Sequence, residues 1–236
     1  EIPKYEWNII DAKSRFRFIA YSYELSAEFG LHFLLFVIQY LRSILHNLEQ
    51  EMVFGFDNGT EFCSGSSRKE MDWNRIVSTM NARIYSYEPR FDIRKNLIER
   101  SHLSDDEELY ISRGIFMKTK KDFTREVTDY AWYWNTKRPH SGIGMADKTP
   151  YEMVKQSKLL GVEKLLAFPT LILDDVINEL KVCTQSVVVD AFLNEHPELM
   201  KKISVDPKIR RNLELKFFLP TDAQNVLTYY QKGIIY

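Results

Sequence analysis

The stretch VFGFDNGTEF, from Val53 to Phe62, joins a short apolar run to a pair of acids. The apolar run predicts a β-strand that ends at Asp57. Asn58 and Gly59 follow at once, and Asp-Asn-Gly is a favourable turn sequence. An aspartate after a strand is most often a turn former. A catalytic role for Asp57 therefore depends on partners elsewhere in the chain.

The composition is that of a globular protein with a buried core. Of the 236 residues, 44% are hydrophobic and 14% aromatic, enough for one large domain or for one domain with an extension. The formal net charge is -1, which argues mildly against a nucleic-acid binder but allows a local basic patch. The two cysteines have no metal-type spacing, which favours a reducing compartment.

The apolar runs and the start of the chain indicate whether the protein enters a membrane and whether the sequence is complete. No apolar run is long enough to span a bilayer, and no signal peptide is visible, so we expect no membrane partner. The chain begins without Met and soon enters a predicted strand. We therefore expect it to be a piece of a longer protein.

The order of predicted elements in the first part of the chain is that of an α/β protein with helices on the faces of its sheet. Two strands make a hairpin, a long helix follows, and a strand, a helix and a strand come next. These elements are strands over 5–10 and 16–25, a helix over 26–46, a strand over 52–56, a helix over 67–81 and a strand over 82–87.

Helices dominate the rest of the chain. Apolar residues recur at helical spacing over 120–135 and predict a helix with one buried face. The sequences SDDE from Ser104 and TPYE from Thr149 both have the form of a capping box, which predicts a helix start at each. Beyond residue 157 the chain reads as mainly helical. We expect this extension to pack on the core or on a second subunit, and not to bind DNA, because its acidic and basic residues balance.

Three acids stand at or near the ends of predicted elements. Asp11 closes the first strand, Asp57 closes a later strand, and Glu99 lies in the helix after the last strand. If the two strands are neighbours, a helix packed over their ends can point Glu99 at both aspartates. Such a cluster is usually stabilised by divalent cations, and a pair of Mg²⁺ or Mn²⁺ ions about 4 Å apart promotes phosphodiester cleavage. From the residues alone, the three acids can be read either as a metal site or as ordinary acids of turns.

Four segments in family order resemble the DDE integrases and insertion-sequence transposases. FDNGTEF is similar to the Asp-Asn-Gly-x-Glu-Phe signature, and NLIER to the segment that carries the last acid of the family. YWNTKRPHSGIGMADKTPYE is similar to Tyr-Asn-x-x-Arg-Pro-His followed by Thr-Pro-x-Glu, and IIDAKSRFRFIAYSYE to the first strand pair. They cover about residues 5–156.

The resemblance implies a ribonuclease H-like fold over residues 1–156, a mixed sheet flanked by helices, with a helical extension over 157–236. It implies that Asp11, Asp57 and Glu99 are the catalytic acids and hold two Mg²⁺ or Mn²⁺ ions. The expected activity is DNA cleavage and strand transfer at element ends and target DNA by a homo-oligomer, in the cytoplasm of a bacterial-type cell.

Basic residues supply candidate phosphate contacts. A basic run lies near the predicted helix over 120–135, and two further basic residues flank Glu99. Binding to DNA through such residues weakens with salt, but a charge run is as often a solvated helix face, and Lys95 can pair with Glu99 four positions on. The candidates are Lys95, Arg100, Lys118, Lys120, Lys121 and Arg125.

Two other functions stay open. The chain could be a domesticated transposase without activity that binds DNA or protein, although its complete set of acids argues against decay. It could also be a ribonuclease H-like nuclease without strand transfer. Arg138, Pro139 and His140 read as structural residues near the core, and Trp7, Trp132 and Trp134 read as core residues rather than base-stacking platforms.

Overall fold

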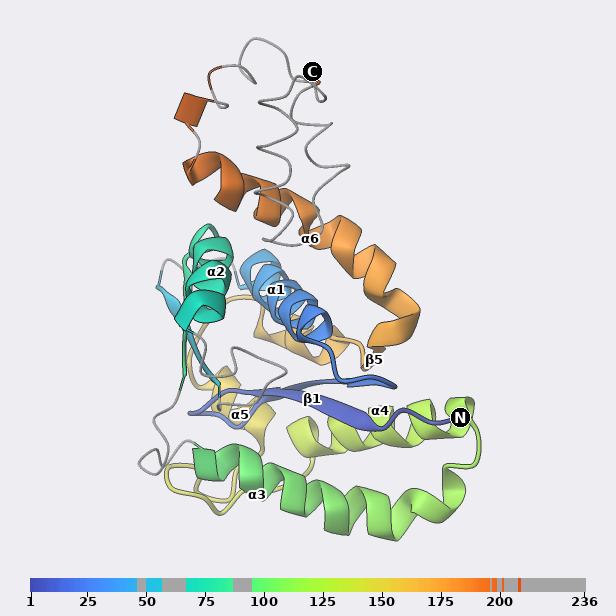
Figure 1. The fold of residues 1–236 in the computed structure, drawn as a ribbon. Coiled ribbons are helices and arrows are strands. Elements are labelled where there is room, and N and C mark those ends of the chain that lie inside the picture. The colour runs from blue at the N-terminus through green and yellow to red at the C-terminus, as the bar shows by residue number, and fades with distance from the viewer. Residues whose placement is uncertain are drawn as a thin grey trace. The chain divides into compact units, whose positions relative to one another are not determined.

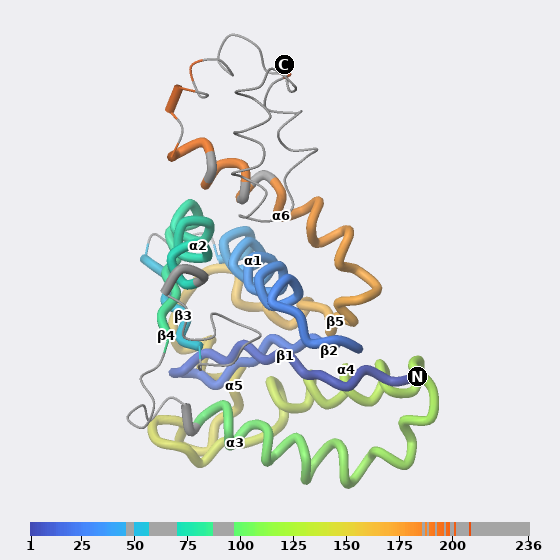
Figure 2. The backbone as a smooth tube through the Cα atoms, viewed as in Figure 1, coloured from blue at the N-terminus to red at the C-terminus, as the bar shows by residue number. Residues whose placement is uncertain are grey.

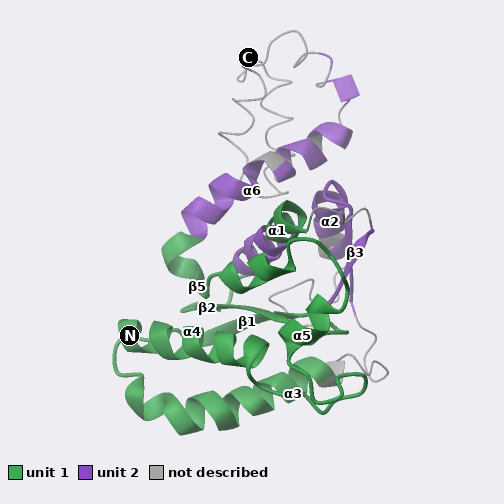
Figure 3. Cartoon of the chain, turned by 180° about the vertical axis from the view of Figure 1, so that it is seen from behind, with its two compact units in different colours: residues 1–26, 39–48, 87–176 green, residues 27–38, 49–86, 177–236 purple. Residues whose placement is uncertain are grey.

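The computed structural model describes residues 1–45, 50–56, 67–86 and 95–195, together with 197, 198, 201 and 208. The chain divides into two compact units, each built from separate stretches of sequence (Figure 3). Unit 1 is Glu1–Ser26, Gln39–Leu48 and Tyr87–Val176, and unit 2 is Ala27–Ile38, Glu49–Ser86 and Ile177–Tyr236.

The described residues form a mixed α/β structure with two small sheets (Figure 1). In its first half the elements are β1 (Tyr5–Ile10), β2 (Arg17–Ser22), α1 (Ala27–Ile44), β3 (Met52–Phe56), α2 (Ser67–Ser78) and β4 (Ala82–Ser86). In its second half they are α3 (Lys95–Asp105), the π-helix η1 (Asp106–Ile111), the short helix η2 (Gly114–Phe116), α4 (Lys120–Thr136), α5 (Pro150–Lys155), η3 (Val162–Ala167), β5 (Leu171–Ile172) and α6 (Leu173–Glu195).

The sheet of unit 1 has the order β1-β2-β5. The strands β1 and β2 form the predicted antiparallel hairpin (Figure 2). Ile10 lies opposite Arg17. The hairpin loop closes because Asp11 donates its backbone N–H to Phe16 and accepts one from Arg15, which has a positive φ of 65°. The strand β5 runs parallel to β2.

One face of this sheet carries the core of unit 1. Side chains alternate along a strand, so Ile19 and Tyr21 of β2 point to the same face. They pack against the buried stripe of α4, as the helical spacing predicts. The buried members of this cluster are Ile19, Tyr21, Leu109, Met117, Phe123, Val127, Tyr130, Trp134 and Ile172. The helices α3 and α4 cover this face (Figure 1).

Unit 2 contains the predicted strand, helix and strand. The strands β3 and β4 are parallel, and α2 is the helix between them. The ring of Phe56 at the end of β3 packs edge-on against Trp73 of α2, with centroids 6.1 Å apart. The side chain of Asn74 bonds both the backbone N–H and the carbonyl of Ile84, which ties α2 to β4.

Four local predictions need correction. Trp132, predicted as a core residue, is 50% exposed. The capping box expected from Ser104 is absent, because α3 runs through Ser104 and continues directly into η1. The residues Leu171–Ile172 form a strand rather than part of a helix, since β2 offers them a free edge. The strand β2 ends at Ser22, short of residue 25. The start of α5 at TPYE is confirmed, with both hydrogen bonds of its capping box formed.

The structure confirms the predicted fold only in part. The mixed α/β class is confirmed, and α6 confirms a helix in the extension. The sheets are small, and β1 and β3 belong to different ones. The domain boundary at residue 157 stays a prediction. Among the described residues, no helix combines the length and the apolar character that crossing a membrane requires.

Candidate active site

Asp11 stands at the end of β1, in the hairpin loop. Its Oδ2 atom accepts hydrogen bonds from the backbone N–H and the hydroxyl of Ser14, both at 2.6 Å. Among the described residues its Oδ1 atom has no hydrogen bond, and the residue is exposed. The carboxylate is thus oriented by the loop on one side and open on the other.

The second predicted acid, Asp57, lies outside the described residues. What the structure describes is the strand that leads to it: β3 ends at the buried Phe56, the residue before Asp57. The predicted convergence of Asp57 with Asp11 stays a prediction.

Glu99 lies on α3, which packs on β1. The side-chain amide of Asn8 donates to the hydroxyl of Ser101 at 3.2 Å, and His102 Nδ1 lies 3.6 Å from a carboxylate oxygen of Glu6. These contacts show that α3 runs antiparallel to β1, so its first turns lie toward the end of β1 that Asp11 follows (Figure 1). Glu99 is exposed on these turns.

The segment around Trp134 holds the hairpin that carries Asp11. The indole N–H of Trp134 donates to the carbonyl of Arg15 at 3.1 Å. The amide of the buried Asn135 bonds both the N–H and the carbonyl of Arg17, each at 2.9 Å. Both contacts bridge more than a hundred positions of sequence, so α4 fixes the backbone directly after the Asp11 turn.

Arg138 and His140 make contacts near the core, as predicted. Arg138 donates to both oxygens of Glu108, with the shortest bond at 2.6 Å, and these bonds lower the pKa of Glu108. The ring of His140 packs edge-on against Trp134, with centroids 4.7 Å apart. Burial, with the charge of Arg138, lowers the pKa of His140 to about 4, so this imidazole is neutral at physiological pH.

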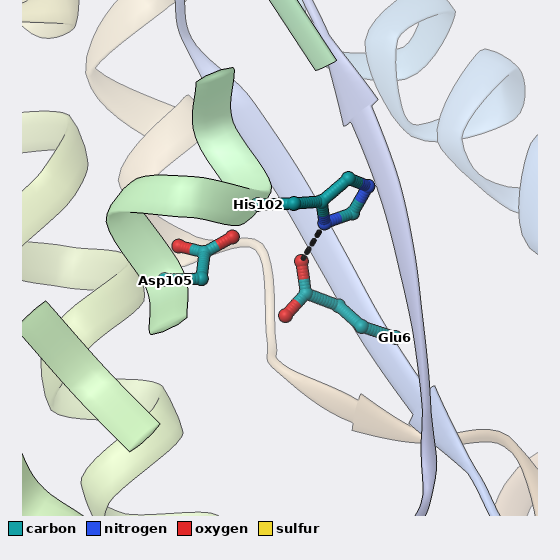
Figure 4. Close-up of side chains that lie close together, drawn as sticks. All are labelled: Glu6, His102 and Asp105. Atoms are coloured by element: carbon teal, nitrogen blue, oxygen red, sulfur yellow. Dashed lines mark ion pairs between the residues drawn. The ribbon is translucent and has the colours of Figure 1, made fainter. Parts of the chain in front are cut away.

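A buried polar cluster that the sequence analysis missed lies between β1, β2 and α3. Arg17 donates from Nη1 to both oxygens of Asp105 at 2.8 Å, and each of these side chains is 1% exposed. Asp105 and His102 face Glu6 of β1 (Figure 4). Burial raises the pKa of Asp105 to about 7, Glu6 adds to the rise and Arg17 opposes it.

The sequence did contain a signal for this cluster. Arg17 alternates with Ile19 and Tyr21 along β2, and Glu6 of β1 lies opposite Tyr21. The four side chains therefore share one face of the sheet, on which Ile19 and Tyr21 are core residues. A charged residue on a buried strand face is costly unless it has a partner. That argument predicts an opposite charge nearby but does not identify Asp105.

The candidate phosphate contacts lie in mixed electrostatic surroundings. Lys120 pairs with Asp175, and Arg125 pairs with Asp122 and Glu126. Lys118, Lys121 and Arg100 are exposed, and the side chain of Lys95 lies outside the described residues. These acids offset part of the positive charge of the basic run. DNA binding by these residues stays a prediction.

Comparison with models of protein families found no match to this chain, and comparison with curated proteins found none either.

Proposed function

We propose that this chain is the catalytic core of a DNA strand-cleaving and strand-transferring enzyme of the DDE transposase and integrase kind. Asp11, Asp57 and Glu99 are its acids, and its fold is of the ribonuclease H-like type. DNA, as element ends and target, is its substrate, and joining two ends in one event requires at least two copies acting together.

One observation supports the proposal most strongly. Two of the four segments that carry the resemblance contact each other: Trp134 and Asn135, from the segment with Arg-Pro-His, bond the backbone of Arg15 and Arg17, just beyond the turn of Asp11. A segment with this role is expected near an active site, because a catalytic acid needs a rigid supporting turn. The antiparallel packing of α3 on β1 adds support, since it directs the turns with Glu99 toward Asp11.

Among the described residues, the carboxylate oxygens of the proposed acids suit hard divalent cations. Asp11 is exposed, and the hydrogen bonds from Ser14 reach only one of its two carboxylate oxygens. Carboxylate oxygens are the ligands that Mg²⁺ and Mn²⁺ prefer. When bound, such ions supply activation of the attacking oxygen and stabilisation of the leaving one. In the proposal Asp11, Asp57 and Glu99 hold them, while Ser14 and Trp134 orient Asp11.

The test is nicking of duplex DNA taken from both flanks of the coding sequence, in Mg²⁺ or Mn²⁺. We expect Asp11→Asn and Glu99→Gln to reduce nicking and strand transfer to background and to leave DNA binding in gel shifts unchanged. The amides keep the size of the side chains but lose the charge that binds the cation.

The matched control is Glu107→Gln, a charge removal at an exposed position of η1. This variant should nick like the parent. Nicking that survives Asp11→Asn, or a parent protein without nicking, would contradict the proposal.

A further inference from the structure

The side chains of Glu6, His102 and Asp105 converge where α3 crosses β1 (Figure 4). Each offers one ligand atom, and these atoms all lie within 4.8 Å of one another. The Nδ1 atom of His102 is 3.6 Å from Oε1 of Glu6. Two ligands on one tetrahedral Zn²⁺ ion are roughly 3.4 Å apart, given metal–ligand distances of about 2.1 Å, so this spacing fits a shared ion.

Two carboxyl groups of this cluster lie beside one arginine. Two carboxylates, Glu6 and Asp105, face each other in a site where Asp105 is 1% exposed. Arg17 supplies one positive charge and directs Nη1 to both oxygens of Asp105. Carboxylate oxygens and an imidazole nitrogen that converge in this way are a ligand set that Zn²⁺ takes in proteins.

The other side chains of the cluster also favour a ligand. The Tyr110 hydroxyl donates to Oε2 of Glu6 at 2.8 Å, which orients this carboxylate with Oε1 toward His102. Tyr21 lies directly opposite Glu6 in the β1–β2 register, on the same face of the sheet. Its side chain is almost fully buried, and its hydroxyl lies beside the hydroxyl of Tyr110. Tyr110 thus fixes the direction of the Glu6 carboxylate, as a group that orients a metal ligand does.

The helix that carries His102 and Asp105 changes its type directly after Asp105. It changes from α to π, and η1 spans Asp106–Ile111. In a π-helix, residues about five apart come close to the same side, so Asp105 and Tyr110 both reach Glu6. In a regular α-helix the two would point in different directions. Single π-turns within helices occur frequently at functional sites.

We propose that Glu6, His102 and Asp105 bind one divalent transition-metal ion of the Zn²⁺ class. The ligands are Oε1 of Glu6, Nδ1 of His102 and a carboxylate oxygen of Asp105, and Arg17 and Tyr110 orient the two carboxylates. The imidazole favours such an ion over Mg²⁺. The site is separate from the proposed catalytic acids, and its bound ion links α3 to β1 and stabilises their packing.

The experiment measures Zn²⁺ binding by titration calorimetry after treatment with EDTA. It uses a chain in which Asp11→Asn, Asp57→Asn and Glu99→Gln remove the proposed catalytic carboxylates, and Cys183→Ser removes an exposed thiol. We expect one Zn²⁺ per chain and a rise in the melting temperature with Zn²⁺. The result does not depend on DNA cleavage, so the two proposals can fail separately.

Two further variants of this chain identify the ligands. His102→Gln changes a half-exposed side chain and should keep the fold, which circular dichroism checks. It should weaken Zn²⁺ binding by at least about tenfold, and so should Glu6→Gln. Glu107→Gln should leave the affinity unchanged. Failure to bind one equivalent of Zn²⁺, or an affinity that His102→Gln does not change, would overturn the proposal.

Discussion

Replacing Arg17 by Met tests how the buried ion pair with Asp105 contributes to stability. Both side chains are 1% exposed and joined at 2.8 Å, so solvent does not screen the pair. Removing one partner leaves a buried charge without compensation, which costs about 3 to 5 kcal/mol of the free energy of unfolding. Arg17→Met also removes the cation–π contact with Trp134, whose ring centroid is 4.2 Å from the guanidinium carbon.

A double-mutant cycle isolates the pair. Asp105→Leu should cost a similar amount, whereas Arg17→Met/Asp105→Leu together should cost less than the sum of the two, because neither charge is then stranded. The contact with Trp134 is lost in both Arg17 variants and cancels in the cycle. We expect a coupling of at least about 2 kcal/mol.

The assay is urea unfolding at neutral pH in EDTA, followed by far-UV circular dichroism and compared through the transition midpoints. Additive costs, with a coupling below about 0.5 kcal/mol, would refute the reasoning. They would mean that the two charges do not depend on each other for compensation in the folded protein.

Three further predictions concern the segment that supports the Asp11 hairpin. His140 has a pKa lowered to about 4, so the unfolded state binds more protons below pH 6.5; stability is kept above that pH and falls by about 2 kcal/mol at pH 5. The variant His140→Phe should lose this part of the acid sensitivity in urea unfolding, and an unchanged pH profile would contradict the assignment. Asn135→Leu should cost about 3 kcal/mol in the same assay, since it leaves two backbone groups of Arg17 unpaired, and a variant as stable as the parent would refute this role. Thr149→Ala should cost about 1 kcal/mol by removing the N-cap of α5, and no loss on thermal melting would argue against that capping box.

The sequence by itself determined the elements whose signals are local. The buried stripe of α4 repeats at helical spacing, and the capping box at Thr149 spans four consecutive residues. The strands before Asp11 and Asp57 end where the apolar and β-branched runs end. Such patterns depend on backbone geometry within a turn or two, so they can be read without knowledge of the fold. The failed capping box at Ser104 marks the limit, because nothing local showed that α3 continues into a π-helix.

Only the tertiary structure decided which distant residues meet. Arg17 pairs with Asp105 across 88 positions, and Asn135 bonds the backbone of Arg17 across 118. The strand β5 pairs with β2 although its two residues carry little strand signal of their own. Arg17 and Glu6 stand on a strand face whose other residues belong to the core, so they need partners. Their partners depend on how α3 and α4 pack over the sheet. A buried charge is stabilised by whichever opposite charge this packing brings near, and the spacing of residues in the sequence does not encode that choice.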